Sequence, residues 1–253
     1  MGLRIQTNIA SINAQRNLSK ATRDLGDSFR RLSTGLRIAS ASDDAAGLAI
    51  SERLRAQIRS IGQADRNAND GISLVQTAEG ALSEVNTILI RMRELATQAS
   101  NGTVSGRATD TLNEEFLAIK SEVDRIAQAT KFSELNLLDG SNSTVRLHIG
   151  PSTTVGVDTF DITFNSVRAT ALGINALDIG STSSALSVIG QIDTAINSVV
   201  RLRGSLGATQ NRLLSTIGQL KVDTENLSSA ESRIRDLDVA SETANLTRST
   251  ILQ

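Results

Sequence analysis

Few side chains in this sequence could do chemistry. The chain contains one histidine, His148, and no cysteine, so a metal site built from paired histidines or thiolates cannot form. An activated nucleophile would also lack its usual neighbouring base. Because His148 stands among alternating apolar residues, we expect it to be a solvent-facing strand residue. The acidic pairs Asp43–Asp44 and Glu114–Glu115 are better explained as helix-start charges and solvated helix faces. We therefore predict no enzyme activity, no cofactor and no metal.

A basic cluster and the overall charge bear on the choice of partner. Arg53, Arg55 and Arg59 could bind a phosphate group, but Leu54 interrupts them and Glu52 offsets their charge, so we interpret them as a solvated face. The formal net charge of −1 gives no electrostatic reason to expect nucleic acid or a membrane as the main partner. No apolar run is long enough to span a bilayer. Polar residues interrupt the apolar part of residues 1–10, so we do not expect a cleavable secretory signal.

The element that must position most of these side chains is a helix over residues 42–101. No proline interrupts this stretch, and its apolar residues recur at alternating steps of three and four. That spacing places on one side of the helix a stripe made of Leu54, Ile58, Ile61, Ala68, Ile72, Val75, Leu82, Leu89 and Met92. At 1.5 Å per residue the helix would be roughly 85 Å long, so its stripe needs partner helices. Gly71 and Gly80 lie inside the stretch, and we interpret both as close-packing or bending points.

Other helical segments supply these partners. We predict a first helix over residues 4–33, a helix over 107–129 and a last helix over 184–234, followed by a partial helix to residue 253. The first helix should end near Gly35, which favours a left-handed C-cap. Ser42, Asp43 and Asp44 offer N-cap oxygens to the long helix. Its short connection to helix 107–129 makes these two helices antiparallel neighbours. The predicted organisation is a terminal helix with linker (1–41), a rod (42–234) and a partial C-terminal helix (235–253).

The hydrophobic period changes to two in the middle of the chain. Val145, Leu147 and Ile149 alternate with polar residues, and so do apolar residues between 160 and 164. Turn signals separate the two runs, so we predict one or two small β-hairpins within residues 130–165. The predicted fold class is mainly α: a long antiparallel helical coiled-coil rod formed by both chain ends, with a small β-hairpin region in the middle.

Several long blocks of the sequence resemble bacterial flagellins. The block RLSTGLRIASASDDAAGLAI at residues 31–50 is similar to the N-terminal signature of that family. Further similar blocks follow in the family's order at residues 67–82, 92–100, 206–213, 226–236 and 247–253. The resemblance covers nearly the whole chain, and it implies a subunit of the flagellar filament.

The resemblance also implies how such a subunit is exported and arranged. It implies secretion through the flagellum by the type III export apparatus with a chaperone, followed by self-assembly into an extracellular helical filament next to hook-associated and cap proteins. The terminal helices would line an inner tube. Because only residues 165–183 lie where the family inserts outer domains, we expect a minimal form without them. We also expect the chain to end before the family's usual C-terminus. The alternative is a hook–filament junction protein. A coiled-coil signalling rod is disfavoured by the period-two region.

Three positions resemble a receptor-recognition surface. In flagellins, the positions that match Arg91, Leu95 and Glu115 contribute to the surface recognised by the host receptor Toll-like receptor five. The resemblance implies the same use of Arg91 and Leu95 on helix 42–101 and of Glu115 on the neighbouring helix. We expect these side chains to serve mainly as contacts between subunits. For Leu95 we favour such a contact over a role in the core of the subunit.

Overall fold

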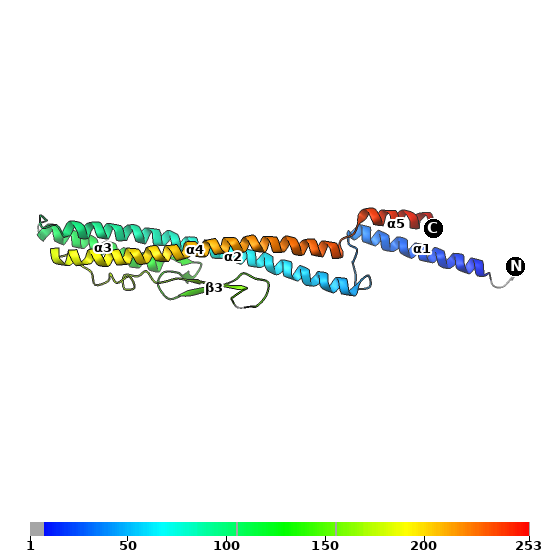
Figure 1. Cartoon of the computed structure of the whole chain (residues 1–253), viewed down its shortest axis with the longest axis horizontal. Coiled ribbons are helices and arrows are strands. Elements are labelled where there is room, and N and C mark those ends of the chain that lie inside the picture. Colours follow the sequence, from blue (N-terminus) through cyan, green and yellow to red (C-terminus); the bar gives the residue numbers. More distant parts are fainter. Residues whose placement is uncertain (1–7, 105, 155, 253) are drawn as a thin grey trace. The chain divides into compact units, whose positions relative to one another are not determined.

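The fold is built from long helices joined by short connections. A computed structural model describes residues 8–104, 106–154 and 156–252 (Figure 1). Its elements in chain order are α1 (Ile9–Thr34), α2 (Ala45–Ala99), α3 (Gly106–Ala129), β1 (Lys131–Phe132), β2 (Leu135–Asn136), β3 (Thr144–His148), β4 (Thr159–Thr163), α4 (Thr182–Arg235) and α5 (Val239–Leu252). The mainly helical fold class with small hairpins is confirmed. The predicted start of the first helix at residue 4 lies outside the described residues.

The chain divides into two compact units. One consists of Ile61–Lys221, and the other combines Met1–Ser60 with Val222–Gln253. Helices α2 and α4 each contribute a segment to both units.

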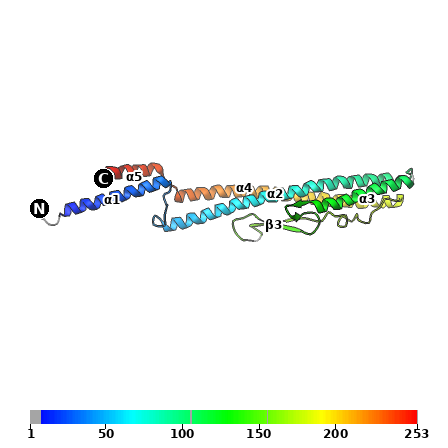
Figure 2. The same ribbon diagram turned by 180° about the vertical axis from the view of Figure 1, so that it is seen from behind.

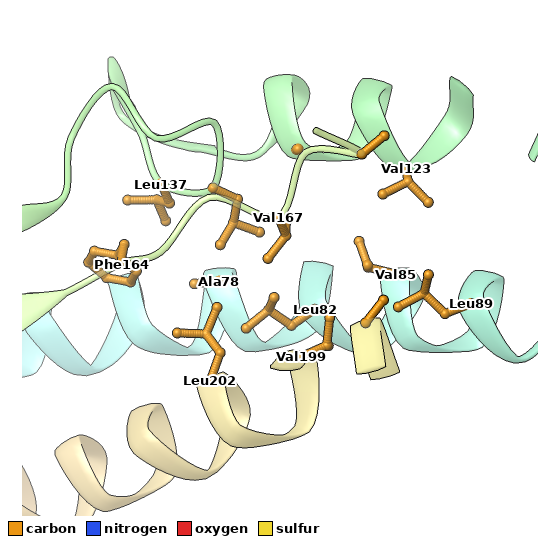
Figure 3. Packing of buried hydrophobic residues seen from close by; sticks show 14 of the residues in the cluster. Ala78, Leu82, Val85, Leu89, Val123, Leu137, Phe164, Val167, Val199 and Leu202 are labelled. Atoms are coloured by element: carbon orange, nitrogen blue, oxygen red, sulfur yellow. The ribbon is translucent and has the colours of Figure 1, made fainter. Parts of the chain in front are cut away.

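The unit Ile61–Lys221 contains a continuous apolar core. Buried side chains come from α2, α3, α4 and the hairpin region, so segments from both ends of the sequence share one core. Figure 3 shows Leu82 and Val85 of α2 facing Val123 of α3 and Val199 of α4. The predicted stripe is confirmed in this unit: Ile61, Ala68, Val75, Leu82, Leu89 and Met92 are all buried.

The two glycines predicted as close-packing points in α2 behave differently. At Gly71, an added Cβ would overlap the side chain of Leu147 on β3 and lie 3.4 Å from Cδ1 of Leu213 on α4. Gly71 therefore permits a close approach, as predicted. Gly80 is exposed and has no atom within 4 Å of such a Cβ, so it is not a close-packing point, and the alternative that it is a bending point stays a prediction.

The β region consists of two small antiparallel hairpins. Strand β1 pairs with β2, and β3 pairs with β4 in the register that places Val145 opposite Ile162 and Leu147 opposite Phe160. Ile162 and Phe160 are buried on the helical side of their sheet, whereas His148 is exposed, as predicted. Viewed from either side, the β3–β4 hairpin lies along the α2–α4 helices (Figures 1 and 2).

Side chains of α3 hold the irregular segment 164–181, which connects β4 to α4. Lys120 donates from Nζ to the carbonyl oxygens of Asn175 (2.8 Å) and Leu177 (3.0 Å). Asp124 Oδ1 accepts a hydrogen bond from the backbone N–H of Ala169 at 2.8 Å. These bonds satisfy backbone groups that would otherwise pair within a helix or sheet. The segment is therefore ordered against the core without secondary structure of its own.

The second unit contains α1, α5 and the linker between α1 and α2. Helix α1 ends at Gly35, whose φ of 68° is the left-handed C-cap that the sequence predicted. The N-cap of α2 is supplied by Asp44, whose Oδ1 accepts from Gly47 N at 2.9 Å. Asp43 instead turns back to the linker and accepts hydrogen bonds from the backbone N–H groups of Ala39 (3.2 Å) and Ser40 (2.9 Å). Helices α1 and α5 pack side by side (Figures 1 and 2).

Candidate assembly and recognition sites

The structure brings two of the three predicted recognition residues together. Arg91 on α2 donates from Nε and Nη2 to Glu115 Oε1 on α3, at 3.1 and 2.8 Å, and from Nη1 to Glu94 at 3.1 Å. The hydrogen bond to Glu115 is the main cause that raises the pKa of the Arg91 guanidinium. All three side chains are exposed, at 50% for Arg91 and 44% for Glu115. The pair therefore presents an exposed charged patch, and solvent weakens its contribution to stability.

Leu95 does not belong to that patch. Its side chain is 0% exposed and lies in the core of the unit Ile61–Lys221. It follows Met92 by three residues and precedes Ala99 by four, which continues the buried stripe of α2. The prediction that Leu95 forms a contact between subunits is therefore wrong, because its surface is already covered within the chain.

A second ion pair attaches α2 to α4 at the same level. Arg93 donates from Nε to Asp193 Oδ1 at 2.7 Å, and this hydrogen bond is the main cause that raises the pKa of Arg93. Residues two apart on a helix point in nearly opposite directions, so Arg91 and Arg93 reach partners on opposite sides of α2. Sequence reasoning missed this pair because no local spacing links residues 100 positions apart.

The unit that contains α1 and α5 has little apolar core. Among the described residues of this unit, Ile38 is the one buried hydrophobic residue. Large apolar side chains of its helices are instead exposed: Ile9, Ile12, Leu18, Phe29, Ile50, Val222, Val239, Ile251 and Leu252, with exposed fractions from 46% to 79%. We call Ile9, Ile12, Leu18, Phe29, Val239, Ile251 and Leu252, which lie on α1 and α5, the terminal apolar set.

Polar side chains are buried between α1 and α5. Ser28 of α1 and Glu242 of α5 are buried there, at 6% and 7% exposed. They line a cavity of about 380 Å³ together with other polar and charged side chains, which include Arg31 and Arg248. The pairing of the two helices within the chain thus buries polar side chains, whereas the side chains of the terminal apolar set remain exposed.

A small clip joins the linker after α1 to the break between α4 and α5. Leu36 and Asp236 form an antiparallel bridge, flanked by hydrogen bonds from Arg37 N to Arg235 O (2.7 Å) and from Leu237 N to Gly35 O (3.1 Å). We call this group of contacts the linker clip.

One ion pair connects the linker clip to the first turns of α2. Arg235, whose side chain is 13% exposed, donates from Nη1 to Glu52 Oε1 at 2.6 Å. This hydrogen bond is the main cause that lowers the pKa of Glu52. Sequence reasoning did not find the linker clip, because the two segments that it joins, 35–37 and 235–237, are far apart in the sequence.

The basic cluster that the sequence analysis considered lies beside acidic side chains. Arg55 of the basic cluster contacts Glu52 (3.2 Å) and Glu231 (3.7 Å), so its charge is already paired. In the described part of the chain, no group of three or more acidic, histidine or cysteine side chains could hold a metal ion. None of the described helices combines the length and the apolar character that a membrane span requires.

Comparison with known proteins gives matches over almost the whole sequence. Residues 5–143 match the family model of the bacterial flagellin N-terminal helical region, and residues 189–253 match that of the C-terminal helical region. A flagellin of Halalkalibacterium halodurans is 46% identical over 248 residues, which cover 98% of this chain and 91% of that protein. A flagellin of Bacillus subtilis is 39% identical, with coverage of 99% and 92%.

Solved structures give a similar result. The crystal structure of Bacillus cereus flagellin is similar with a TM-score of 0.55 at 30% identity, covering 61% of this chain and 88% of that one. A putative flagellar hook-associated protein from Vibrio parahaemolyticus gives a TM-score of 0.65 at 16% identity, covering 77% and 100%. At that identity the second likeness concerns the fold alone.

Proposed function

This chain belongs to the bacterial flagellin family, and we propose that it is a structural subunit of the flagellar filament whose copies assemble through the terminal apolar set. The observation that carries the proposal is the uncovered apolar surface of α1 and α5. A unit in which a single described hydrophobic residue is buried gains little stability from its own core. Apolar side chains that are half exposed or more gain stability when neighbouring copies cover them.

The size of this effect can be worked out from the exposed apolar side chains. Completing the burial of a large apolar side chain that is half exposed contributes roughly 1 kcal/mol. For the terminal apolar set the sum is several kcal/mol per subunit before the entropy of association is subtracted. Each subunit in a helical polymer contacts several neighbours, so modest interfaces add up along the filament.

Export and location follow from the same proposal. We infer that the subunit is secreted by the type III flagellar export apparatus with the help of a chaperone. It would then act outside the cell, next to hook-associated and cap proteins. The family is a structural one, and we propose no enzymatic role.

The test is polymerisation of a double variant. Phe29→Ser with Ile12→Ser should weaken assembly by roughly 2 kcal/mol, which is about thirtyfold in critical concentration. Val157→Ser is the matched control, because it makes the same chemical change at a side chain that is 75% exposed in the β3–β4 loop. Sedimentation would measure the critical concentration, and electron microscopy would identify filaments. Equal critical concentrations for the double variant and the parent would refute the role of the terminal apolar set.

The same micrographs distinguish the alternative role. A hook–filament junction protein would form rings of few copies and would not propagate. Long filaments from the parent protein exclude that alternative, whereas rings alone would favour it.

We also propose that the exposed patch of Arg91, Glu94 and Glu115 is recognised by Toll-like receptor five. The support is the sequence resemblance together with the fixed geometry of the Arg91–Glu115 pair. Leu95 has no part in it, since it is buried. In a receptor reporter assay, Arg91→Ala and Glu115→Ala should each reduce signalling. Arg125→Ala, which breaks an exposed pair with Glu122 on α3, is the control. No signal from the parent protein, or full signal from both variants, would end the proposal.

A further inference from the structure

The turn between α2 and α3 contains a chemical feature that lies outside the terminal apolar set. Asn101 and Gly102 follow the last residues of α2, and they form the only Asn-Gly sequence in the chain. Both residues are exposed. We propose that Asn101 is a site of spontaneous deamidation in the folded subunit, giving an aspartate and isoaspartate mixture at this turn. This inference does not depend on the proposed function.

The nucleophile of the reaction is accessible. It is the backbone nitrogen of Gly102, for which the described structure shows no hydrogen bond. A Cβ placed on Gly102 would have no atom within 4 Å, so the space that a ring would occupy is open. Glycine also lacks the side chain that hinders approach of this nitrogen to the preceding residue.

The electrophile is held by an Asx turn. Asn101 Oδ1 accepts a hydrogen bond from the backbone N–H of Thr103 at 3.3 Å, and Asn101 O accepts one from Val104 N at 3.1 Å. An Asx turn folds the side-chain amide back over the following peptide, which brings Cγ toward the Gly102 nitrogen. The N–H of Thr103 points to the oxygen on which negative charge develops during attack, as a donor in an oxyanion hole does.

The covalent steps balance without an external oxidant or reductant. The Gly102 nitrogen loses its proton and bonds to Asn101 Cγ, the Cγ–Nδ2 bond breaks, and ammonia leaves with that proton. The product is a five-membered succinimide. Water then adds to one of its two carbonyl carbons and opens the ring. Opening at Cγ gives aspartate, and opening at the backbone carbonyl gives isoaspartate, whose chain continues through the side-chain carbon. The net change is water in and ammonia out.

The product would alter the end of α2. A new carboxylate would stand just beyond the C-terminus of this helix, where the helix dipole disfavours negative charge. Isoaspartate would also lengthen the main chain of the turn by one carbon and make the oxygen that now accepts from Thr103 a main-chain carbonyl oxygen. The modification thus adds a negative charge at this turn and, in the isoaspartate product, a longer main chain.

The experiment is incubation of the full chain at mildly alkaline pH, followed by peptide mass mapping. The peptide with Asn101 should gain about 1 Da and resolve into two products, one of which an isoaspartyl methyltransferase labels. Asn165, which is exposed and precedes Ser166, serves as the internal control. Gly102→Ala should abolish the new species within the same incubation, and circular dichroism should show unchanged helix content.

Three outcomes would overturn the proposal. The first is a reaction at Asn165 as fast as that at Asn101, and the second is a rate at Asn101 that Gly102→Ala leaves unchanged. The third concerns the fold itself: the folded chain should react at a rate comparable to that of the chain unfolded in urea. A reaction seen in urea but absent in the folded chain would show that the native turn protects Asn101, contrary to the inference.

Discussion

Gly71 and Gly80 of α2 provide a paired test of the packing. Both Gly71 and Gly80 lie in the same helix, and neither has a positive φ. Replacement by alanine therefore changes the helix propensity equally at both positions, by about 0.8–1.0 kcal/mol in favour of folding. The difference in the free energy of unfolding between the two variants then measures the effect of the atoms that the added methyl group contacts.

The structure gives opposite signs for the two changes. At Gly80 nothing lies within 4 Å of the new Cβ, so Gly80→Ala should stabilise the protein by about 1 kcal/mol. At Gly71 the methyl group overlaps Leu147 and lies 3.4 Å from Leu213 Cδ1. Overpacking of this kind costs about 1–3 kcal/mol. After the gain in propensity, Gly71→Ala should have a net cost of roughly 0–2 kcal/mol, and the two variants should differ by about 1–3 kcal/mol.

Urea unfolding followed by far-ultraviolet circular dichroism measures both free energies, and an unchanged m-value shows that the comparison is valid. Leu147→Ala provides a further check, because it removes the side chain that Gly71→Ala meets. In the double variant the cost of Gly71→Ala should largely disappear, which a double-mutant cycle would detect. Equal stabilisation by Gly71→Ala and Gly80→Ala would refute the predicted cost of the overlap with Leu147.

Three further predictions concern the linker clip, the terminal helices and the segment after β4. Because its partner Arg235 lowers the pKa of Glu52, the stabilisation from this pair is complete above the ordinary value of 4.5 and is lost as pH falls through the lower folded value. The protection of the Leu237 amide against hydrogen exchange, corrected for the intrinsic exchange rate, should therefore fall in that acidic range. Glu52→Gln should show the same reduced protection already at neutral pH. In the unassembled protein, amides of α1 and α5 should exchange faster than those of α2 after residue 60, since their unit has little apolar core. Equal protection would contradict this. Lys120→Met frees two carbonyl oxygens in segment 164–181 and should speed its cleavage in limited proteolysis, whereas Arg125→Met should not.

The helices and their buried faces could be predicted from the sequence because helical periodicity is a local signal. Leu82, Leu89 and Met92 repeat at steps that no strand or loop would maintain, and all three are buried. The hairpins were predictable for the same reason, since apolar and polar residues alternate along β3 and β4. On β4 the apolar Ile162 is buried, whereas the polar residues on either side of it are exposed.

The candidate site was less accessible to sequence reasoning. The spacing of Leu95 from Met92 and Ala99 already indicated a core position, but the assignment by resemblance placed it on the surface. The linker clip and the Arg93–Asp193 pair depend on which helices become neighbours, and no local pattern carries that information. The exposed state of Phe29 was equally hidden, because an apolar stripe does not say whether the same chain or another copy will cover it.

The linker clip has a mechanical consequence for the unit that contains it. The chain passes between the α1–α5 pair and the remaining turns of that unit twice, once through the linker and once through the break after Arg235. With a single connection, the α1–α5 pair could rotate about the axis of that connection. Two connections that are joined to each other by backbone hydrogen bonds resist this rotation but still allow the α1–α5 pair to bend. Torque applied to α1 is therefore carried through its own linker and, by way of the linker clip and the packing against α5, through the connection after Arg235.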